Sequence, residues 1–467
     1  MSEATSEANA GEPGEPISSE AVCRVDDNTL DTGKIPIVFV PGVMGSRLHF
    51  PEIGQSWDPD STWAMIHWVR ISAERTRQEF TLTNPAEVMT ENDDLTAAQR
   101  ERGWAGVAWG FYGQFVQDLQ RQRFGRYQTP VYVIGYDWRQ NNRTSGDAVA
   151  RRIEQILARE GVERFILISH SMGGLVTRAC LKNNAGVAGK AIGVVHIAQP
   201  VHGAAVLVRR MFTGAVSSVD GGVGLAMVLG NNRKKFQTIM SALPGPMQLL
   251  VTNHYRDTDG SGWYDYASFE HPATTQRWEG DVWSLYASPQ SPPGLLAPAG
   301  QPYSLDPVPR REFARRLAEA RDYHAWVDVW KHEQTWSIYS TGLVADMRVH
   351  FELPAAHYDM HVMPSFDMAP PVILYSAKRA DGTEVTVGDP NPENRGNVMR
   401  RRPQSDSTVP TPSGEGLFPG QQHAVKIGSD YDALRQFRIS GAAHDAICHD
   451  GNCERCLFDI LRHVLGV

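Results

Sequence analysis

The sequence predicts an α/β fold in which a mainly parallel central sheet is flanked by helices. Three observations support this prediction. Short apolar runs typical of buried strands recur along the chain, segments with helical spacing lie between them, and one such strand runs through Ser171 into a helix. Since neighbouring parallel strands need long crossover connections, this alternation indicates a parallel sheet with helices on both faces.

The expected elements can be placed in chain order. Buried strands are expected at 35–41, 131–136, 165–168, 191–197 and 335–340, with short late strands at 425–427 and 437–439. Helices are expected at 111–121, 147–159, 175–181, 313–330 and 453–465. An Asp-Gly pair at 381–382 between two apolar runs predicts a β-hairpin over 372–387.

The length of 467 residues suggests about three domains, but the pattern favours one catalytic domain with insertions. Residues 1–33 are rich in Glu, Ser, Gly and Pro, which predicts a disordered acidic tail. Residues 34–467 are predicted to form the α/β domain. Cap or lid insertions are expected at about 51–105, 205–334 and 345–400, because the alternating pattern lapses there.

The charge distribution argues against a nucleic-acid-binding protein. Residues 1–34 hold eight acidic and two basic residues, so most of the net charge of −8 lies in the predicted tail. The remainder is nearly neutral and has no basic excess to neutralise phosphates. No apolar run is long enough for a transmembrane segment, and the N-terminus has no secretory signal. A cytoplasmic location is the default expectation, and export without a cleaved signal stays open.

The cysteines do not suggest a disulfide framework, because they are odd in number and sparse. They are Cys23, Cys180, Cys448, Cys453 and Cys456. The last three have the opening spacing of an iron–sulfur site, but the fourth cysteine is absent. A zinc site that also uses His449 is the alternative to partly buried thiols on a loop and helix, which is the preferred interpretation.

The strongest chemical signal is Ser169-His170-Ser171-Met172-Gly173, between an apolar strand and a helix. This arrangement is typical of the Gly-x-Ser-x-Gly elbow, in which a tight turn presents a nucleophilic serine above the sheet. Ser169 replaces the first glycine, and serine is still a small residue. We therefore predict Ser171 as the nucleophile and the Met172 N–H as an oxyanion donor. The alternative is a serine-containing turn without chemistry.

A second oxyanion donor is expected in the loop after the first strand, at residues 41–46. We assign it to the N–H of Val43. The glycines of this loop suggest phosphate binding as an alternative. However, the loop lacks the Lys-Ser/Thr of a P-loop and matches no dinucleotide-binding fingerprint.

In an enzyme with this elbow, the acid and then the histidine follow the serine in chain order. Asp406 lies beyond the expected hairpin, and His444 directly follows the last expected strand. Taken alone, Asp406 reads as a turn or helix-capping residue and His444 as a surface histidine. The ordered set of Ser171, Asp406 and His444 favours a catalytic triad.

Together these segments resemble the lecithin:cholesterol acyltransferase-like branch of the α/β-hydrolases, which includes lysosomal-type phospholipases A and bacterial lipases. The similar segments are IVFVPGVMGSRL (37–48), GYDWRQNN (135–142), SHSMGG (169–174), IAQPVHGA (197–204), DSTVP (406–410) and GAAHDAI (441–447). Ser407 stands where the family has glycine. Residues 205–334 and 345–400 match poorly, so substrate choice is the least transferable inference.

The resemblance implies an α/β-hydrolase that cleaves carboxylic esters of lipids, as a phospholipase A or a lipase, through an acyl-enzyme. Ser171 would be the nucleophile, Asp406 the acid and His444 the base, with oxyanion donors at Val43 and Met172. No cofactor or metal is implied. The expected partners are a lipid ester substrate and, peripherally, a lipid surface, while protein partners are unknown.

Three alternatives stay open from the sequence. The same triad serves an acyltransferase that moves a fatty acyl group to a lipid alcohol. An antibacterial phospholipase toxin, delivered by a secretion system, would use it as well. A catalytically inactive binding module would keep the fold without the chemistry.

Other side chains have two interpretations each. The tryptophans face lipid or pack in the interior; they are Trp57, Trp63, Trp68, Trp104 and Trp109 early in the chain and Trp263, Trp278 and Trp283 later. Asp137 and Arg139 are expected to form a structural ion pair. The basic clusters at 209–210, 233–235 and 400–402 could contact lipid phosphates, but solvated surface is the preferred interpretation for each.

Overall fold

The computed structural model describes residues 33–215, 228–256, 264–267, 275–277, 280–288, 294–296, 299, 304–351, 372–378, 384–388, 396–421, 423–424 and 430–467. Several sequence predictions lie outside these residues. They are the disordered tail apart from Gly33, the strand at 425–427, the hairpin turn at Asp381–Gly382, and the environments of Cys23, Trp263 and Trp278.

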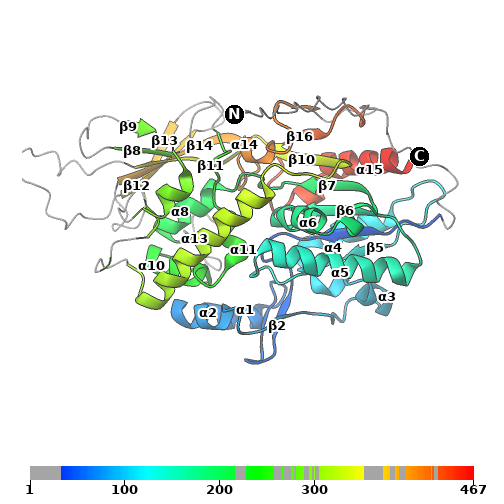
Figure 1. Ribbon diagram of the computed structural model, residues 1–467, viewed down its shortest axis with the longest axis horizontal. Helices are drawn as coiled ribbons and strands as arrows, with labels where there is room; N and C mark the ends of the chain where they lie inside the picture. The colour runs from blue at the N-terminus through cyan, green and yellow to red at the C-terminus, as the bar shows by residue number, and fades with distance from the viewer. Residues whose placement is uncertain are drawn as a thin grey trace, which may run out of the picture.

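A parallel sheet forms the core of the described chain and confirms the predicted fold class (Figure 1). Its seven strands lie in the order β15-β16-β10-β7-β6-β1-β5, and each pairs in parallel with its neighbours. The strands are β1 (Ile37–Val40), β5 (Val131–Val133), β6 (Phe165–His170), β7 (Ala191–Ile197), β10 (Thr335–Thr341), β15 (His423–Ala424) and β16 (Gln436–Ser440).

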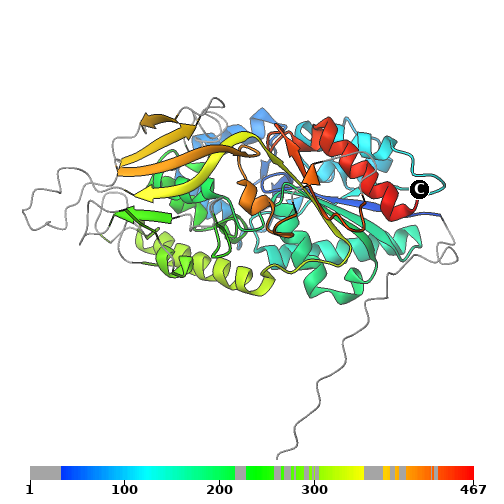
Figure 2. The ribbon, with the colours of Figure 1, turned by 90° about the horizontal axis from the view of Figure 1, so that it is seen from above.

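The two faces of this sheet are covered by different helices, which explains why its strands are apolar on both sides. On β1, Val38 and Val40 pack in one core cluster with α5 (Asn142–Glu160) and α6 (Met172–Asn183). Ile37 and Phe39 alternate with them and pack with α4 (Trp109–Arg121) and α15 (Gly451–Leu465). Figure 2 shows α15 and the α5–α6 pair on opposite sides of the sheet.

Local signals set the ends of the long helices. The Asn141 side chain caps α5 by accepting from the Arg143 N–H, and Gly161 ends it in the left-handed region at φ 66°. The helix expected at 313–330 is α13 (Pro307–Val327). It begins earlier because Pro307 suits the first helical turn, and it ends earlier because Asp328 adopts a φ of 44°.

A second sheet accounts for much of the insertion expected at 345–400, and the sequence predicted only its hairpin. In the described residues it has the order β13-β12-β14-β11-β8-β9. Its strands are β8 (Tyr264–Ala267), β9 (Thr275–Arg277), β11 (Leu343–Phe351), β12 (Val372–Lys378), β13 (Glu384–Gly388) and β14 (Gly396–Ser405). The predicted hairpin is the antiparallel pair β12–β13. Only Gly342 separates the end of the central strand β10 from the start of β11, so the two sheets are directly joined.

The insertion expected at 51–105 is a compact layer at the lower edge of Figure 1. Stacked and edge-to-face aromatic rings fill its interior, among them Trp57, Trp68 and Phe80. Its elements are β2 (Leu48–Phe50), β3 (Gln55–Trp57), α1 (Thr62–Arg70), α2 (Ala73–Phe80), β4 (Glu87–Val88), α3 (Ala97–Glu101) and η1 (Trp104–Gly106).

The tryptophans of this insertion differ in their environments. Trp57, Trp68 and Trp104 are buried, and Trp109 is partly buried against the core. Trp63 is 83% exposed on α1, so it alone among these five fits the lipid-facing interpretation. Trp283, in the later insertion, is buried.

The insertion expected at 205–334 packs against this layer. Helix α10 (Arg233–Met240) contacts α2, and Arg77 of α2 forms an ion pair with Glu312 of α13 at 2.6 Å. The remaining elements among the described residues are α7 (Ala185–Ala188), α8 (Ala205–Thr213), α11 (Pro244–Met247), α12 (Val282–Tyr286), α14 (Thr411–Gly414) and η4 (Ile447–His449).

Several charged side chains are structural. The guanidinium of Arg139 is fully buried, binds both carboxylate oxygens of Asp137 at 2.8 Å, and donates to three backbone carbonyls of the 51–105 insertion. Arg209 and Arg233 are also buried, so the expectation of solvated surface was wrong for them. Arg233 donates to the Leu295 carbonyl, a partner that no local pattern indicates.

The four described cysteines are free thiols in the interior. Cys453 and Cys456 lie on the buried face of α15, and Cys448 packs beside them. The described residues contain no group of three or more His, Cys, Asp or Glu side chains that could hold a metal ion. Among the helices described, none is both long and apolar enough to cross a membrane.

Candidate active site

The structure brings Ser171, His444 and Asp406 into one chain of hydrogen bonds. His444 Nε2 lies 2.8 Å from Ser171 Oγ, and His444 Nδ1 lies 2.7 Å from Asp406 Oδ2. The Ser171 and Asp406 side chains come from loops at the ends of β6 and β14, and His444 follows β16. Ser171 is 5% exposed, Asp406 is 2% exposed, and His444 is partly buried.

The turn at Ser171 has the strained backbone of a nucleophile elbow. Its φ of 53° and ψ of −129° are rarely adopted by a residue other than glycine, at a cost of about 1–3 kcal/mol. The next helical turn passes close to the neighbouring strand end: a Cβ at Gly173 would lie 2.4 Å from the Pro41 carbonyl oxygen. Glycine is therefore required there, as the motif predicts.

Ser169 has a specific partner that explains why serine replaces glycine. Its hydroxyl lies 2.7 Å from Nδ1 of His196, the residue paired with it on the adjacent strand β7. Burial lowers the pKa of His196 to about 3, so the ring is neutral and hydrogen bonds as an imidazole. The Ser169 hydroxyl and the His196 ring nitrogen thus each have a hydrogen-bond partner inside the core.

The acid loop is fixed by its own backbone. Asp406 Oδ1 accepts from the N–H groups of Thr408 at 3.0 Å and Val409 at 2.6 Å, which leaves Oδ2 for His444. Ser407 adopts a φ of 80°, in the region that favours glycine. The family's glycine at this position therefore has a conformational reason, and Ser407 occupies it with strain.

The charge on Asp406 tunes His444. Burial disfavours a charged imidazole, but the Asp406 carboxylate and its hydrogen bond outweigh burial, so the pKa of His444 is raised above its ordinary 6.5. The neutral ring accepts a proton through Nε2, and the adjacent carboxylate stabilises the cation that forms. This arrangement can activate a serine hydroxyl.

The two predicted oxyanion donors remain available. Among the described residues, neither the Val43 N–H nor the Met172 N–H has a hydrogen-bond acceptor. Both lie beside the nucleophile: Met172 begins α6, and a Cβ at Gly42 would lie 2.9 Å from Ser171 Cβ. The geometry thus leaves two backbone donors at the serine, as an oxyanion hole requires.

The sequence did not reveal the side chains that hold the oxyanion loop at residues 41–46. The Tyr112 hydroxyl accepts from the Gly42 N–H at 3.1 Å, and the Tyr136 hydroxyl donates to the Pro41 carbonyl at 3.1 Å. His170, which lies 2.9 Å from the Tyr112 hydroxyl, belongs to the elbow motif, so the sequence already placed it beside Ser171. No sequence signal distinguishes Tyr112 from the other apolar-face residues of its helix.

We expect Ser169→Gly, which restores the strict motif, to lower the free energy of unfolding by about 1–3 kcal/mol. The reason is that buried His196 would lose its partner. Chemical denaturation measures the effect. Ser169→Ala is the matched variant, because it removes the hydroxyl without adding the backbone freedom of glycine. A Ser169→Gly protein as stable as the wild type would contradict this account.

Comparisons with known proteins agree with this fold. Residues 105–269 match the family model of lecithin:cholesterol acyltransferase, a range that contains Ser171 and Met172 but not Val43, Asp406 or His444. A curated relative, lecithin-cholesterol acyltransferase-like 4 of Arabidopsis thaliana, is 23% identical over 218 residues. The match covers 42% of this chain and spans only 40% of the relative's length.

A solved structure is similar over nearly the whole chain. A chain in the crystal structure of the Tle4–Tli4 complex superposes with a TM-score of 0.65 at 18% identity, over 93% of this chain and 99% of that chain. At this identity the likeness shows the fold. The family match at 105–269 supports the predicted resemblance to lecithin:cholesterol acyltransferase-like proteins for that segment, and the shared fold confirms an α/β-hydrolase fold for the chain.

Proposed function

We propose that this chain is a serine-dependent lipid ester hydrolase, of the phospholipase A or lipase kind. The observation that carries the proposal is the continuous hydrogen-bonded chain from Ser171 through His444 to Asp406, beside two unused backbone donors. The family of the matched segment supports a lipid acyl group as the part of the substrate that is transferred.

The proposed first half-reaction forms an acyl-enzyme. His444 Nε2 takes the Ser171 hydroxyl proton while Oγ bonds to the ester carbonyl carbon, and the carbonyl electrons move to oxygen. The Val43 and Met172 N–H groups stabilise this oxyanion, each by about 3–4 kcal/mol. When the intermediate collapses, the ester C–O bond breaks and the alcohol leaves with the proton from His444.

The second half-reaction releases the acyl group. A water molecule loses a proton to His444 as its oxygen attacks the acyl carbon, and the fatty acid leaves as the proton returns to Ser171 Oγ. If a lipid alcohol takes the place of water, the product is a new ester. The family match supports this acyltransferase alternative equally.

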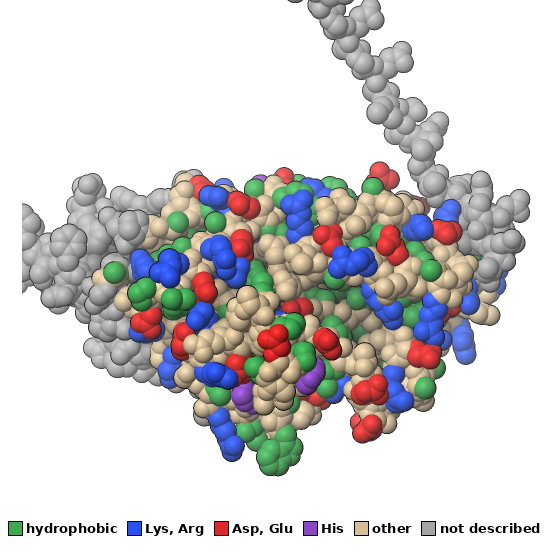
Figure 3. All heavy atoms as spheres, turned by 60° about the horizontal axis from the view of Figure 1, so that its bottom comes forward, with side chains coloured by type: hydrophobic (Ala, Val, Ile, Leu, Met, Phe, Trp, Pro, Cys, Tyr) green, Lys and Arg blue, Asp and Glu red, His purple; other side chains and the backbone are tan. Residues whose placement is uncertain are grey.

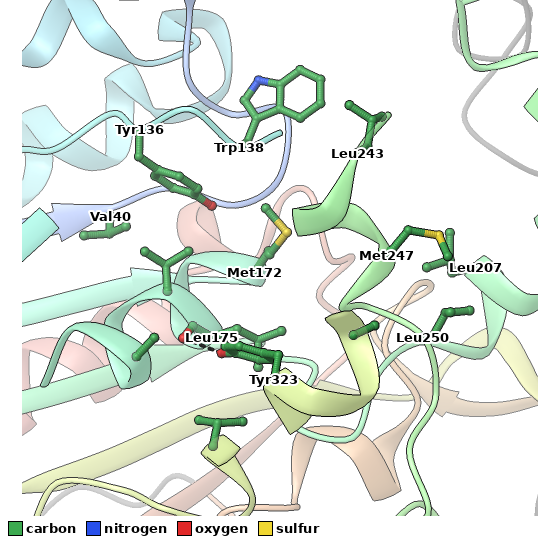
Figure 4. Packing of buried hydrophobic residues seen from close by; sticks show 14 of the residues in the cluster. Val40, Tyr136, Trp138, Met172, Leu175, Leu207, Leu243, Met247, Leu250 and Tyr323 are labelled. Carbon is green, nitrogen blue, oxygen red and sulfur yellow. Dashed lines mark hydrogen bonds between the residues drawn. The ribbon is translucent and has the colours of Figure 1, made fainter. Parts of the chain in front are cut away.

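Apolar side chains beside the elbow support an acyl-chain substrate. The side chain of Met172 lies on the side of α6 that faces Leu243 and Met247 of the cap (Figure 4). Leu207 and Leu250 extend the same cluster. Leu207, Leu243, Met247 and Leu250 come from the cap insertion expected at 205–334, although the family match extends into it as far as residue 269. The cap sets chain and head-group preference in this proposal.

A lipid surface is the proposed site of action, and Trp63 is the proposed contact. Asp60 accepts from the backbone N–H groups of Trp109 and Gly110, which places the start of α1 beside the start of α4. The exposed rings of Trp63 and Phe111 follow on these two helices. On the face of the molecule shown in Figure 3, acidic and basic side chains are interspersed, which suits a neutral rather than a strongly anionic lipid surface.

A protein partner is a further part of the proposal. The solved chain with a similar fold was crystallised as part of a complex, Tle4–Tli4. This supports binding of a separate protein by the present chain and keeps the toxin alternative open. Toxicity on delivery to the periplasm of a bacterium, lost in Ser171→Ala, would support that alternative.

We expect Ser171→Ala to lower ester cleavage by about 10⁴- to 10⁶-fold, because the variant lacks the hydroxyl oxygen that would form the acyl-enzyme. The assay measures fatty acid release from triglyceride, phosphatidylcholine, phosphatidylethanolamine and phosphatidylglycerol. Adding a long-chain alcohol separates the alternatives: acyl ester formation faster than fatty acid release would replace the hydrolase by an acyltransferase. Activity that survives in Ser171→Ala would exclude both.

The pH dependence should report His444. The base must be neutral, so kcat/KM should fall with decreasing pH, with a midpoint above 6.5 because the pKa of His444 is raised. Asp406→Asn removes the carboxylate charge, so the midpoint should move to lower pH while the rate falls by about 10³- to 10⁴-fold. An acidic limb at the same pH in both proteins would contradict the assignment of Asp406.

We expect Trp63→Ala to weaken partitioning onto phosphatidylcholine vesicles by about tenfold, because the exposed ring would no longer enter the interface. Cosedimentation measures it. Val308→Ala is the control, since Val308 is an exposed apolar residue on α13. Hydrolysis of a soluble short-chain ester should be unchanged in both variants. Equal sedimentation of wild type and Trp63→Ala would exclude Trp63 as the contact.

A further inference from the structure

Two buried side chains connect the oxyanion loop to the loop that carries His444. The Gly42 N–H donates to the Tyr112 hydroxyl at 3.1 Å, and that hydroxyl lies 2.9 Å from His170 Nδ1. On the other side of the ring, His170 Nε2 lies 2.9 Å from the backbone carbonyl oxygen of His444. Tyr112 and His170 therefore bridge two loops that are far apart in the sequence.

The direction of each hydrogen bond in this bridge can be worked out. A carbonyl oxygen only accepts, so His170 Nε2 must carry the proton that it shares with His444. Burial lowers the pKa of His170 to about 3, so the neutral ring has one N–H and Nδ1 must accept. The Tyr112 O–H then donates to Nδ1, and its oxygen accepts from Gly42.

The bridge holds the oxyanion loop from one side. Gly45 lies directly against the Tyr112 ring, since a Cβ there would be 2.8 Å from Cε2. The hydrogen bond from Gly42 fixes the peptide that precedes Val43, and it uses the one N–H of Gly42. The next N–H in the loop, that of Val43, is left for an oxyanion.

The same bridge holds the base from its backbone side. The His444 ring reaches Ser171 and Asp406, and its main-chain carbonyl is bound by His170. The His170 and His444 ring centroids are 5.0 Å apart. A cation at His170 would oppose the cation that forms on His444 during the reaction, so neutrality of His170 suits this position.

We propose that Tyr112 and His170 are positioning residues that set the oxyanion loop and the general base in one fixed relative geometry. This inference rests on the proposed function, because it assigns roles relative to that reaction. Neither side chain exchanges a proton with substrate. Both act by holding groups that do, and a small displacement of such groups is costly to rate.

The test uses the full chain and begins with Tyr112→Phe and His170→Phe. We expect each to lower kcat by between about 10- and 100-fold while KM for a soluble ester changes less than about twofold. The double variant should lose no more than the larger single loss, because the two residues form one bridge. Losses that multiply in the double variant, or a wild-type kcat in Tyr112→Phe, would overturn the proposal.

Two further variants separate positioning from general stability. Tyr286→Phe removes another buried hydroxyl, which donates to the Val251 carbonyl in the cap, and it should keep a wild-type kcat. His170→Gln keeps an N–H donor for the His444 carbonyl, so it should recover part of the rate lost in His170→Phe. Equal losses in Tyr286→Phe and Tyr112→Phe at equal melting temperature, or no recovery in His170→Gln, would count against a positioning role.

The outcome is distinguishable from failure of the proposed function. Ser171→Ala is measured in the same assay, and activity that does not depend on Ser171 would remove the proposed function itself. Ser171-dependent activity with wild-type kinetics in Tyr112→Phe would remove only the present inference.

Discussion

His444 is held at all four of its polar atoms, and the geometry of the site depends on this constraint. Its N–H donates to the Asp406 carbonyl at 2.6 Å, its carbonyl accepts from His170, and its two ring nitrogens bind Asp406 and Ser171. The partners come from two parts of the chain, the adjacent residues His170 and Ser171 at the elbow and Asp406 in the acid loop. These hydrogen bonds hold His444 in one orientation. They can form only if the ends of the strands β6, β14 and β16 lie close together.

The sequence predicts the parts of the fold in which short-range patterns decide the structure. The apolar runs of β1, β6 and β7 are buried on both faces, and the elbow at Ser171 needs small residues that can be recognised locally. The strand β14 was missed because its Arg400–Arg402 run indicates solvated surface, whereas its pairing with β11 is a long-range interaction. Tyr112 was missed for the same reason, since its contact with His170 joins residues 58 positions apart.

The insertions are built around the catalytic edge of the central sheet. The chain leaves that edge at Leu343 in β11 and returns to it at Ser405 in β14. These two residues pair, and Ser405 Oγ donates to the Leu343 carbonyl at 2.9 Å. The chain between them can vary in length without moving Asp406, because this pairing closes the loop at its base. The 51–105 insertion is fixed in a similar way by Arg139, whose fully buried charge would be costly without Asp137 and the carbonyls.

The long separation between Ser171 and His444 also has a consequence for the cell that makes the protein. The two residues are 273 positions apart, so the serine is synthesised roughly 14–55 s before the histidine at ordinary elongation rates. During that interval, a nascent chain has a complete elbow but no base. Under the proposed function, the chain would therefore stay inactive toward esters during its synthesis, and the triad would be complete only when the late strand β16 joins the sheet.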